Sequence, residues 1–218
     1  MEAVIICGGP INEAMLKDKY EDLKEESKEV LLIAADKGLE SCIKLDLKPD
    51  FIIGDFDSAS DAAFDYAKNA DSKLIKLNPI KDDTDTEAAL GLAYENSDGT
   101  IYLLGATGGR LDHFMGNMAL LCQGLERNRQ VIILDEKNQI RMIKDKLTLG
   151  KNQQYGRFVS IMPWGGKAEG VSLKGFKYSL DKATITNDNT LGISNEIESE
   201  EAVITVESGI LIIFETKD

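Results

Sequence analysis

The sequence predicts an α/β protein with an N-terminal, mostly parallel sheet flanked by helices and a C-terminal all-β sandwich domain. Short apolar runs alternate with helical stretches up to residue 136, which implies helical crossovers between parallel strands. Beyond that residue the long helical patterns stop, and short β-like runs alternate with Gly, Asn, Asp and Ser. Hydrophobic residues make up 43% of the 218 residues, enough for a real core. We therefore expect domains at residues 1–136 and 137–218.

The strands of the first domain are expected where apolar residues cluster between turn signals. Val4-Ile5-Ile6-Cys7 is the first and ends at Gly8-Gly9-Pro10. The expected strands are residues 4–7, 30–34, 51–53, 73–77, 101–104 and 131–134.

Helices are expected between these strands. The clearest is residues 113–127, whose apolar residues recur at spacings of three and four. The others are residues 12–28, 38–45, 60–69 and 85–94.

The second domain is expected to contain six short strands. They are residues 139–143, 158–162, 170–173, 183–186, 202–206 and 210–214. A module of about 80 residues is marginal alone, so packing against the first domain or a second subunit would stabilise it.

Charge and cysteine usage exclude several classes of partner. The formal net charge of -13 argues against binding to nucleic acid or to an anionic membrane surface. Cys7, Cys42 and Cys122 form no Cys-x-x-Cys pair and are interpreted as reduced thiols. No signal-type segment and no apolar run of about 20 residues is present, so a cytoplasmic protein is expected. The single histidine, His113, excludes a multi-histidine metal site.

Acidic motifs recur close to the expected strand ends. Because the carboxyl ends of parallel strands lie along one edge of a sheet, these acids are expected to meet there. Carboxylate oxygens suit Mg²⁺, which in turn suits phosphate transfer. The motifs are Ala35-Asp36-Lys37-Gly38, Gly54-Asp55-Phe56-Asp57-Ser58, Lys81-Asp82-Asp83-Thr84-Asp85 and Gly108-Gly109-Arg110-Leu111-Asp112-His113.

Asp55 and Asp57 point to the same side if the strand continues through them, and a divalent cation would relieve their repulsion. The alternative is a simple strand-to-helix loop with Ser58 or Ser60 as the N-cap. Recurrence of acids at neighbouring strand ends favours the metal site.

The segment 81–87 has a structural explanation as well as a functional one. Thr84 and Glu87 match a capping box, and acids are favoured in a first helical turn. Because Asp82, Asp83 and Asp85 repel each other, we expect a capped helix that also presents Asp85 to a metal.

The loop Gly105-Ala106-Thr107-Gly108-Gly109 joins a strand to a helix, where backbone N–H groups can approach phosphates. It matches neither the Walker P-loop nor Gly-x-Gly-x-x-Gly. Arg110 could clamp phosphate oxygens or form a structural ion pair with Asp112. His113 could cap the helix or face the site, and Asn117 would share its face.

Taken in this order, the four motifs resemble those of the thiamine pyrophosphokinases in their bacterial form. Ser194-Asn195-Glu196 is similar to the motif of that family's C-terminal module. The resemblance implies an α/β catalytic domain, a β-sandwich, and a homodimer that binds thiamine near the subunit interface. It also implies transfer of a pyrophosphoryl group from ATP to the thiamine hydroxyl, with release of AMP.

The resemblance assigns roles to individual residues. The catalytic acids would be Asp55, Asp57, Asp85 and Asp112, of which the first three would hold Mg²⁺. Asp112 could accept the hydroxyl proton or bind metal. The nucleotide side would comprise Asp36, Lys81, Thr107, Arg110 and His113. The thiamine side would comprise Tyr178, Ser194 and Asn195.

Two positions depart from the family pattern. Lys37 stands where glycine is common, and its side chain could reach phosphate or remain only exposed. Ile197 follows Ser-Asn-Glu where an aromatic residue is often found.

Two rival functions remain open. Asp55-Phe56-Asp57 is similar to the Asp-x-Asp of haloacid-dehalogenase phosphohydrolases, although Ser60 is a poor match to their pattern. A sensor that binds nucleotide or thiamine without turnover is the non-enzymatic alternative.

Overall fold

The computed structural model describes residues 1–27, 29–55, 65–66, 71–78 and 83–218. Within them the chain divides into two compact units, Met1–Glu136 and Lys137–Asp218. Most of the helix expected at residues 60–69 lies outside the described residues, as do Asp57 and Lys81. In the described part of the chain, no helix is long and apolar enough to cross a membrane.

The first unit is built on a parallel sheet. Its strands are β1 (Glu2–Ile6), β2 (Val30–Ala35), β3 (Phe51–Gly54), β4 (Lys73–Lys76), β5 (Ile101–Leu104) and β6 (Val131–Leu134). Their order is β4-β3-β2-β1-β5-β6, and each neighbouring pair runs parallel. This confirms the parallel sheet predicted from the alternation of strands and helices.

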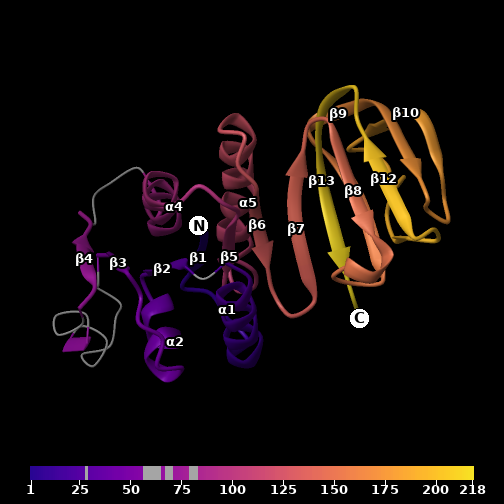
Figure 1. Cartoon of the computed structure of the whole chain (residues 1–218). Helices are drawn as coiled ribbons and strands as arrows, with labels where there is room; N and C mark the ends of the chain where they lie inside the picture. The colour runs from indigo at the N-terminus through magenta and orange to yellow at the C-terminus, as the bar shows by residue number, and fades with distance from the viewer. Residues whose placement is uncertain (28, 56–64, 67–70, 79–82) are drawn as a thin grey trace. The chain divides into compact units, whose positions relative to one another are not determined.

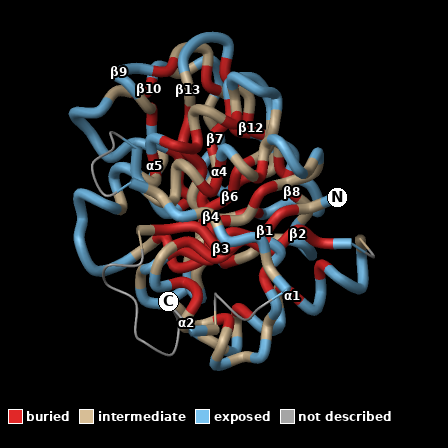
Figure 2. The backbone as a smooth tube through the Cα atoms, turned by 90° about the vertical axis from the view of Figure 1, so that its left-hand side faces the viewer, coloured by how far each residue is buried: buried red, intermediate tan, exposed pale blue. Residues whose placement is uncertain are grey.

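Helices cover both faces of this sheet. Figure 1 shows α1 (Glu13–Ser27) and α2 (Gly38–Lys44) on one side and α4 (Asp85–Asn96) on the other. The fourth described helix of this unit, α5 (Leu111–Glu126), packs beside β6 and α4. Every residue of β2 is buried, as the red strand segments in Figure 2 illustrate. A strand covered on both faces needs apolar side chains on both faces, which explains the unbroken Val-Leu-Leu-Ile-Ala-Ala run.

The second unit is entirely β except for the 3₁₀ turn η1 (Lys151–Gln153). Its strands are β7 (Asn138–Ile143), β8 (Lys146–Gly150), β9 (Phe158–Lys174), β10 (Leu180–Thr186), β11 (Asn195–Glu196), β12 (Glu201–Thr205) and β13 (Ser208–Thr216). The strand pairs formed within this unit are antiparallel.

Strand β9 belongs to both sheets of this unit. Its first half pairs with β13 and β11, and its second half pairs with β10 and β12. Prediction from sequence split it into two strands, at 158–162 and 170–173, and this was wrong. Gly165 and Gly166 carry positive φ values of 80° and 128°, so the strand can bend there without ending.

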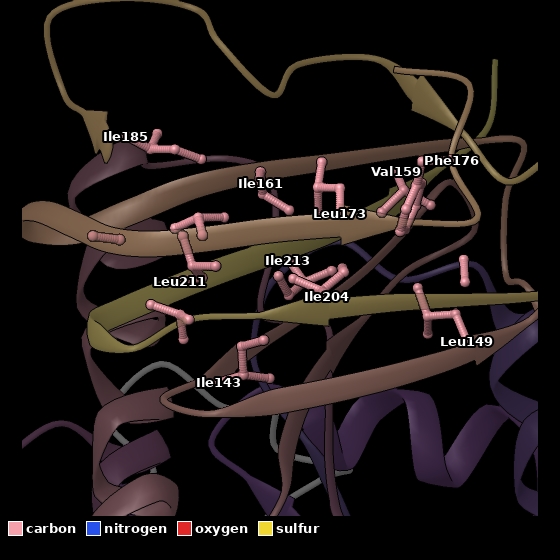
Figure 3. Packing of buried hydrophobic residues seen from close by; sticks show 14 of the residues in the cluster. Ile143, Leu149, Val159, Ile161, Leu173, Phe176, Ile185, Ile204, Leu211 and Ile213 are labelled. Atoms are coloured by element: carbon pink, nitrogen blue, oxygen red, sulfur yellow. The ribbon is translucent and has the colours of Figure 1, made fainter. Parts of the chain in front are cut away.

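The core of the second unit lies between its two sheets. Figure 3 shows side chains from β7, β8, β9, β10, β12 and β13 meeting there, among them Ile161, Leu173, Ile204 and Ile213. These four side chains are no more than 2% exposed. The sandwich predicted for the C-terminal part is therefore present and has its own hydrophobic core.

Candidate functional site

The strand order of the first unit creates a crevice between β1 and β5. From β1 the sheet grows through β2, β3 and β4 in one direction, and the chain then returns to place β5 and β6 on the other side of β1. Open α/β sheets bind ligands at the carboxyl ends of strands where the order reverses in this way. A cavity of about 370 Å³ lies at this point.

Five segments of the first unit line the cavity. They are residues 7–10 after β1, residues 35–37 after β2, residues 84–86 at the start of α4, the loop 105–110 after β5, and His113 with Asn117 on α5. The cavity thus brings together five of the predicted site residues: Asp36, Asp85, Thr107, Arg110 and His113. Asp55 and Asp112 are not among the lining residues.

Asp36 and Asp55 follow neighbouring strands. The backbone N–H of Asp36 donates to the Ile53 carbonyl at 2.8 Å, and a Cβ placed on Gly54 would lie 3.3 Å from the Asp36 Cα. Asp36 itself has φ +50°, a left-handed conformation that is uncommon outside glycine, asparagine and aspartate. Such conformations persist where surrounding structure holds them, often at functional sites.

The loop Gly8-Gly9-Pro10 also lines the cavity, and the sequence did not predict this. The Gly9 N–H donates to the Gly105 carbonyl at 3.0 Å, and a Cβ on Gly9 would lie only 2.4 Å from that oxygen. A Cβ on Gly105, whose φ is +68°, would lie 2.8 Å from the Cys7 carbonyl oxygen. The available signal in the sequence was that glycines follow two buried strands, Gly8-Gly9 after β1 and Gly105 after β5. Only glycine lets the two loops touch through their backbones.

The start of α4 is capped as predicted. Thr84 is the N-cap residue, and its Oγ1 accepts from the Glu87 N–H at 3.2 Å. The Glu87 carboxylate accepts from Gln123 Nε2 of α5 at 2.8 Å. These bonds fix the first turn of α4, and with it Asp85, at the cavity.

Cys7 is one of the residues that line the cavity. Burial raises the pKa of its thiol to about 12, opposed in part by a hydrogen bond with the Thr86 side chain. The thiol is therefore protonated at neutral pH and unreactive. Its contact with Thr86 links β1 to the first turn of α4.

The loop after β5 is held by α5. Asn117 Nδ2 donates to the Ala106 carbonyl at 2.9 Å, which joins the second turn of the helix to the middle of the loop. Gly108 and Gly109 have φ values of 82° and 63°. Backbone N–H groups of such a loop and of the following helix N-terminus favour an anion.

Arg110 and Asp112 form a two-point ion pair. Arg110 Nε and Nη2 donate to the two Asp112 carboxylate oxygens at 3.1 and 2.6 Å. These bonds lower the pKa of Asp112 to about 2, and a further bond from the His113 N–H assists. Both side chains are largely exposed, and the Nη1 edge of Arg110 takes no part in the pair.

A second group of predicted site residues lies in the sandwich unit. Asn195 is 3% exposed, and its Oδ1 accepts from the N–H groups of Tyr178 and Glu196 at 3.0 and 2.9 Å. Its Nδ2 donates to the Tyr178 carbonyl at 2.7 Å. Ser194 has φ +57° and donates its N–H to Ser160 Oγ at 2.9 Å. Tyr178 and Asn195 line a cavity of about 270 Å³ that also includes Leu191 and Ile193.

Comparison with known proteins decides the family. The model "Thiamin pyrophosphokinase, catalytic domain" matches residues 23–133, and "Thiamin pyrophosphokinase, vitamin B1 binding domain" matches residues 144–211. The chain belongs to the thiamine pyrophosphokinase family. A curated relative, thiamine pyrophosphokinase of Bacillus subtilis, is 32% identical over 214 residues and covers 98% of each chain.

Solved structures of this family have the same fold. The crystal structure of the Bacillus subtilis thiamine pyrophosphokinase aligns with a TM-score of 0.87 and 30% identity over the whole of both chains. The structure from Geobacillus thermodenitrificans aligns with a TM-score of 0.86 and 29% identity, covering 100% of this chain and 98% of the other. Yeast thiamin pyrophosphokinase, at 14% identity and a TM-score of 0.81, shares the fold.

The acids of this family member fit a hard divalent cation in their chemistry. Asp55 follows β3 and Asp85 begins α4, so the first unit offers carboxylate oxygens, which Mg²⁺ prefers. Among the described residues no group of three His, Cys, Asp or Glu side chains is arranged to hold a metal. Asp57, one of the three predicted metal ligands, lies outside the described residues.

Proposed function

We propose that the chain transfers the pyrophosphoryl group of ATP to the hydroxyl of thiamine, giving thiamine diphosphate and AMP. Membership of the thiamine pyrophosphokinase family makes it an ATP-dependent diphosphotransferase. The observation that carries the proposal to particular residues is the cavity between β1 and β5. It combines a glycine loop, a guanidinium and two carboxylates where an α/β sheet binds ligands.

The cavity would bind the nucleotide. The N–H groups of the 105–109 loop and the start of α5 would face phosphate oxygens, with Thr107 and His113 beside them. Arg110 would stabilise negative charge on the transferring group or on the leaving AMP through the Nη1 edge that Asp112 does not use. Asp36 and Lys81 complete the predicted nucleotide side.

Asp55, Asp57 and Asp85 are the residues that would hold Mg²⁺. When bound, the ion neutralises phosphate oxygens and favours an in-line arrangement around the β-phosphorus. The three carboxylates would set its place relative to the glycine loop. Loss of one carboxylate should therefore impair turnover without unfolding the chain.

Asp112 is better suited to positioning or metal binding than to proton abstraction. With a pKa of about 2 in its pair with Arg110, it is a weak proton acceptor at neutral pH. In this arrangement it aligns Arg110 at the rim of the cavity. A role as general base would require the ion pair to open first.

Thiamine would be bound on the side of the sandwich unit that carries Tyr178, Ser194 and Asn195. The small cavity there is partly apolar, and Tyr178, Leu191 and Ile193 leave 61%, 46% and 43% of their surface exposed. Exposed apolar side chains around a cavity suit an aromatic ligand or the surface of a second subunit. The proposed assembly is a homodimer, and the proposed location is the cytoplasm.

Product analysis tests this proposal. Purified protein, Mg-ATP and thiamine should yield AMP and thiamine diphosphate in equal amounts, and a chelator should abolish both. ADP with thiamine monophosphate would instead indicate a simple kinase. Binding of thiamine or ATP without product would support the sensor, and phosphate release through a trapped aspartyl-phosphate would support the phosphohydrolase.

Two substitutions test the metal site. Asp55→Asn and Asp57→Asn should each retain the fold, as judged by circular dichroism, and lose most of the turnover. A wild-type rate from either purified variant would contradict its place in the metal site.

A further inference from the structure

We propose that Lys37 binds the phosphate chain of ATP directly and is a determinant of nucleotide affinity in this chain. The inference rests on the proposed nucleotide cavity. It assigns a role to a side chain that the sequence left open between phosphate binding and mere exposure.

The backbone around Lys37 is held firmly at the cavity wall. Lys37 follows Asp36 after β2 and has helical φ and ψ values of -61° and -14° as the N-cap residue of α2. A Cβ on the next residue, Gly38, would lie 2.0 Å from the Ile6 carbonyl oxygen, so β1 and this turn are in backbone contact. A Cβ on Gly8 would lie 3.4 Å from the Lys37 Cβ. The lysine side chain therefore starts beside the loop after β1, and the fixed backbone sets the direction of its Cα–Cβ bond.

Lys37 differs from the other described cation of the cavity in its partners. Among the described residues that line the cavity, Lys37 and Arg110 carry the positive side chains. Arg110 is held by Asp112 through two hydrogen bonds. No ion pair joins Lys37 to any other residue that the structure describes, whereas Lys44 at the far end of α2 pairs with Glu13 at 3.1 Å. Lys37 can thus meet an incoming phosphate without first breaking an ion pair.

The negative charge of the cavity also favours a positively charged side chain at its wall. Asp36 and Asp85 line it, and the whole chain has a formal net charge of -13. A polyphosphate entering this field is repelled, and an ammonium group at the wall offsets part of that repulsion. A lysine ammonium is a compact charge on a flexible stem and binds phosphate oxygens with charge-assisted hydrogen bonds.

A contact to a phosphate that is present before and during the reaction affects binding more than chemistry. Loss of one charge-assisted hydrogen bond is therefore expected to raise the KM for ATP about 10-fold and to leave kcat within about twofold. The KM for thiamine should not change.

The experiment compares Lys37→Gln and Lys37→Met with the conservative Lys37→Arg and with the control Lys44→Gln. Initial rates are measured against ATP and against thiamine, and Mg-ATP binding without thiamine is measured by calorimetry. Both neutral variants should bind ATP more weakly than the wild type, in the kinetic assay and in calorimetry. Lys37→Arg should keep most of the wild-type affinity for ATP, and Lys44→Gln should match the wild type.

The outcomes separate this inference from the proposed function. ATP affinity within twofold of wild type in both neutral variants would overturn the role of Lys37, even if the wild type makes thiamine diphosphate. Equal weakening by Lys44→Gln would overturn it as well, because the effect would then be one of general charge. If the wild type makes no thiamine diphosphate, but binds ATP and the neutral Lys37 variants bind it more weakly, the inference stands and the proposed reaction is refuted.

Discussion

Replacing Asn195 with alanine should destabilise the sandwich unit by about 3 kcal/mol. The buried amide makes three hydrogen bonds to backbone groups, two with Tyr178 and one with Glu196. Each hydrogen bond contributes about 1 kcal/mol, and alanine leaves all three backbone groups without their hydrogen-bond partner. With a urea dependence of about 2 kcal/mol per molar, the unfolding midpoint should fall by about 1.5 M.

The chain contains a natural probe for this measurement. Its single tryptophan, Trp164, lies on β9 in the same unit, so fluorescence reports the unfolding of the sandwich. Asn152→Ala is the matched control, because Asn152 is exposed in the same unit and should change stability by no more than about 0.5 kcal/mol. A midpoint for Asn195→Ala within about 0.3 M of wild type would refute the reasoning. The amide would then be held for a ligand rather than for the fold.

Three further predictions concern the first unit. Gly9→Ala should lower the affinity for ATP at least 10-fold. The new Cβ would lie 2.4 Å from the Gly105 carbonyl oxygen and push the two cavity loops apart. Unchanged ATP binding in calorimetry would contradict this. Carboxyl-carbon NMR should place the pKa of Asp112 near 2, and Arg110→Gln should raise it towards 3.8. Because the folded pKa lies below the unfolded value, the ion pair stabilises the fold above about pH 4 and this contribution is lost as the pH falls towards 2. Cys7, with its pKa raised to about 12, should resist iodoacetamide at pH 8 until urea unfolds the chain, and rapid labelling of the native protein would show that it is accessible as thiolate.

Local patterns accounted for the parts of the structure that depend on neighbours in sequence. The apolar run at residues 30–34 predicted the strand β2, and Thr84 with Glu87 predicted the start of α4. Both predictions succeed because an apolar run and an N-cap bond involve only a few neighbouring residues. The division between helix-rich and β-only parts followed from the same periodicities.

Features that depend on which strands become neighbours were missed or left open. The sequence did not predict that β9 would run unbroken through Gly165-Gly166, because its two halves are stabilised by different partner strands. It left Arg110 undecided between an ion pair and a phosphate clamp, and the fold places it in an ion pair with Asp112 at the rim of the cavity.

By itself, the sequence determined the family and the two kinds of fold, since ordered motifs and periodicity are properties of the chain. Only the tertiary structure decided that the loop at Gly9 would join the loop after β5 in one cavity. That outcome depends on β5 pairing beside β1, although about 95 residues separate them in the chain. Such long-range pairing is set by the burial of the whole sheet, which no local pattern encodes.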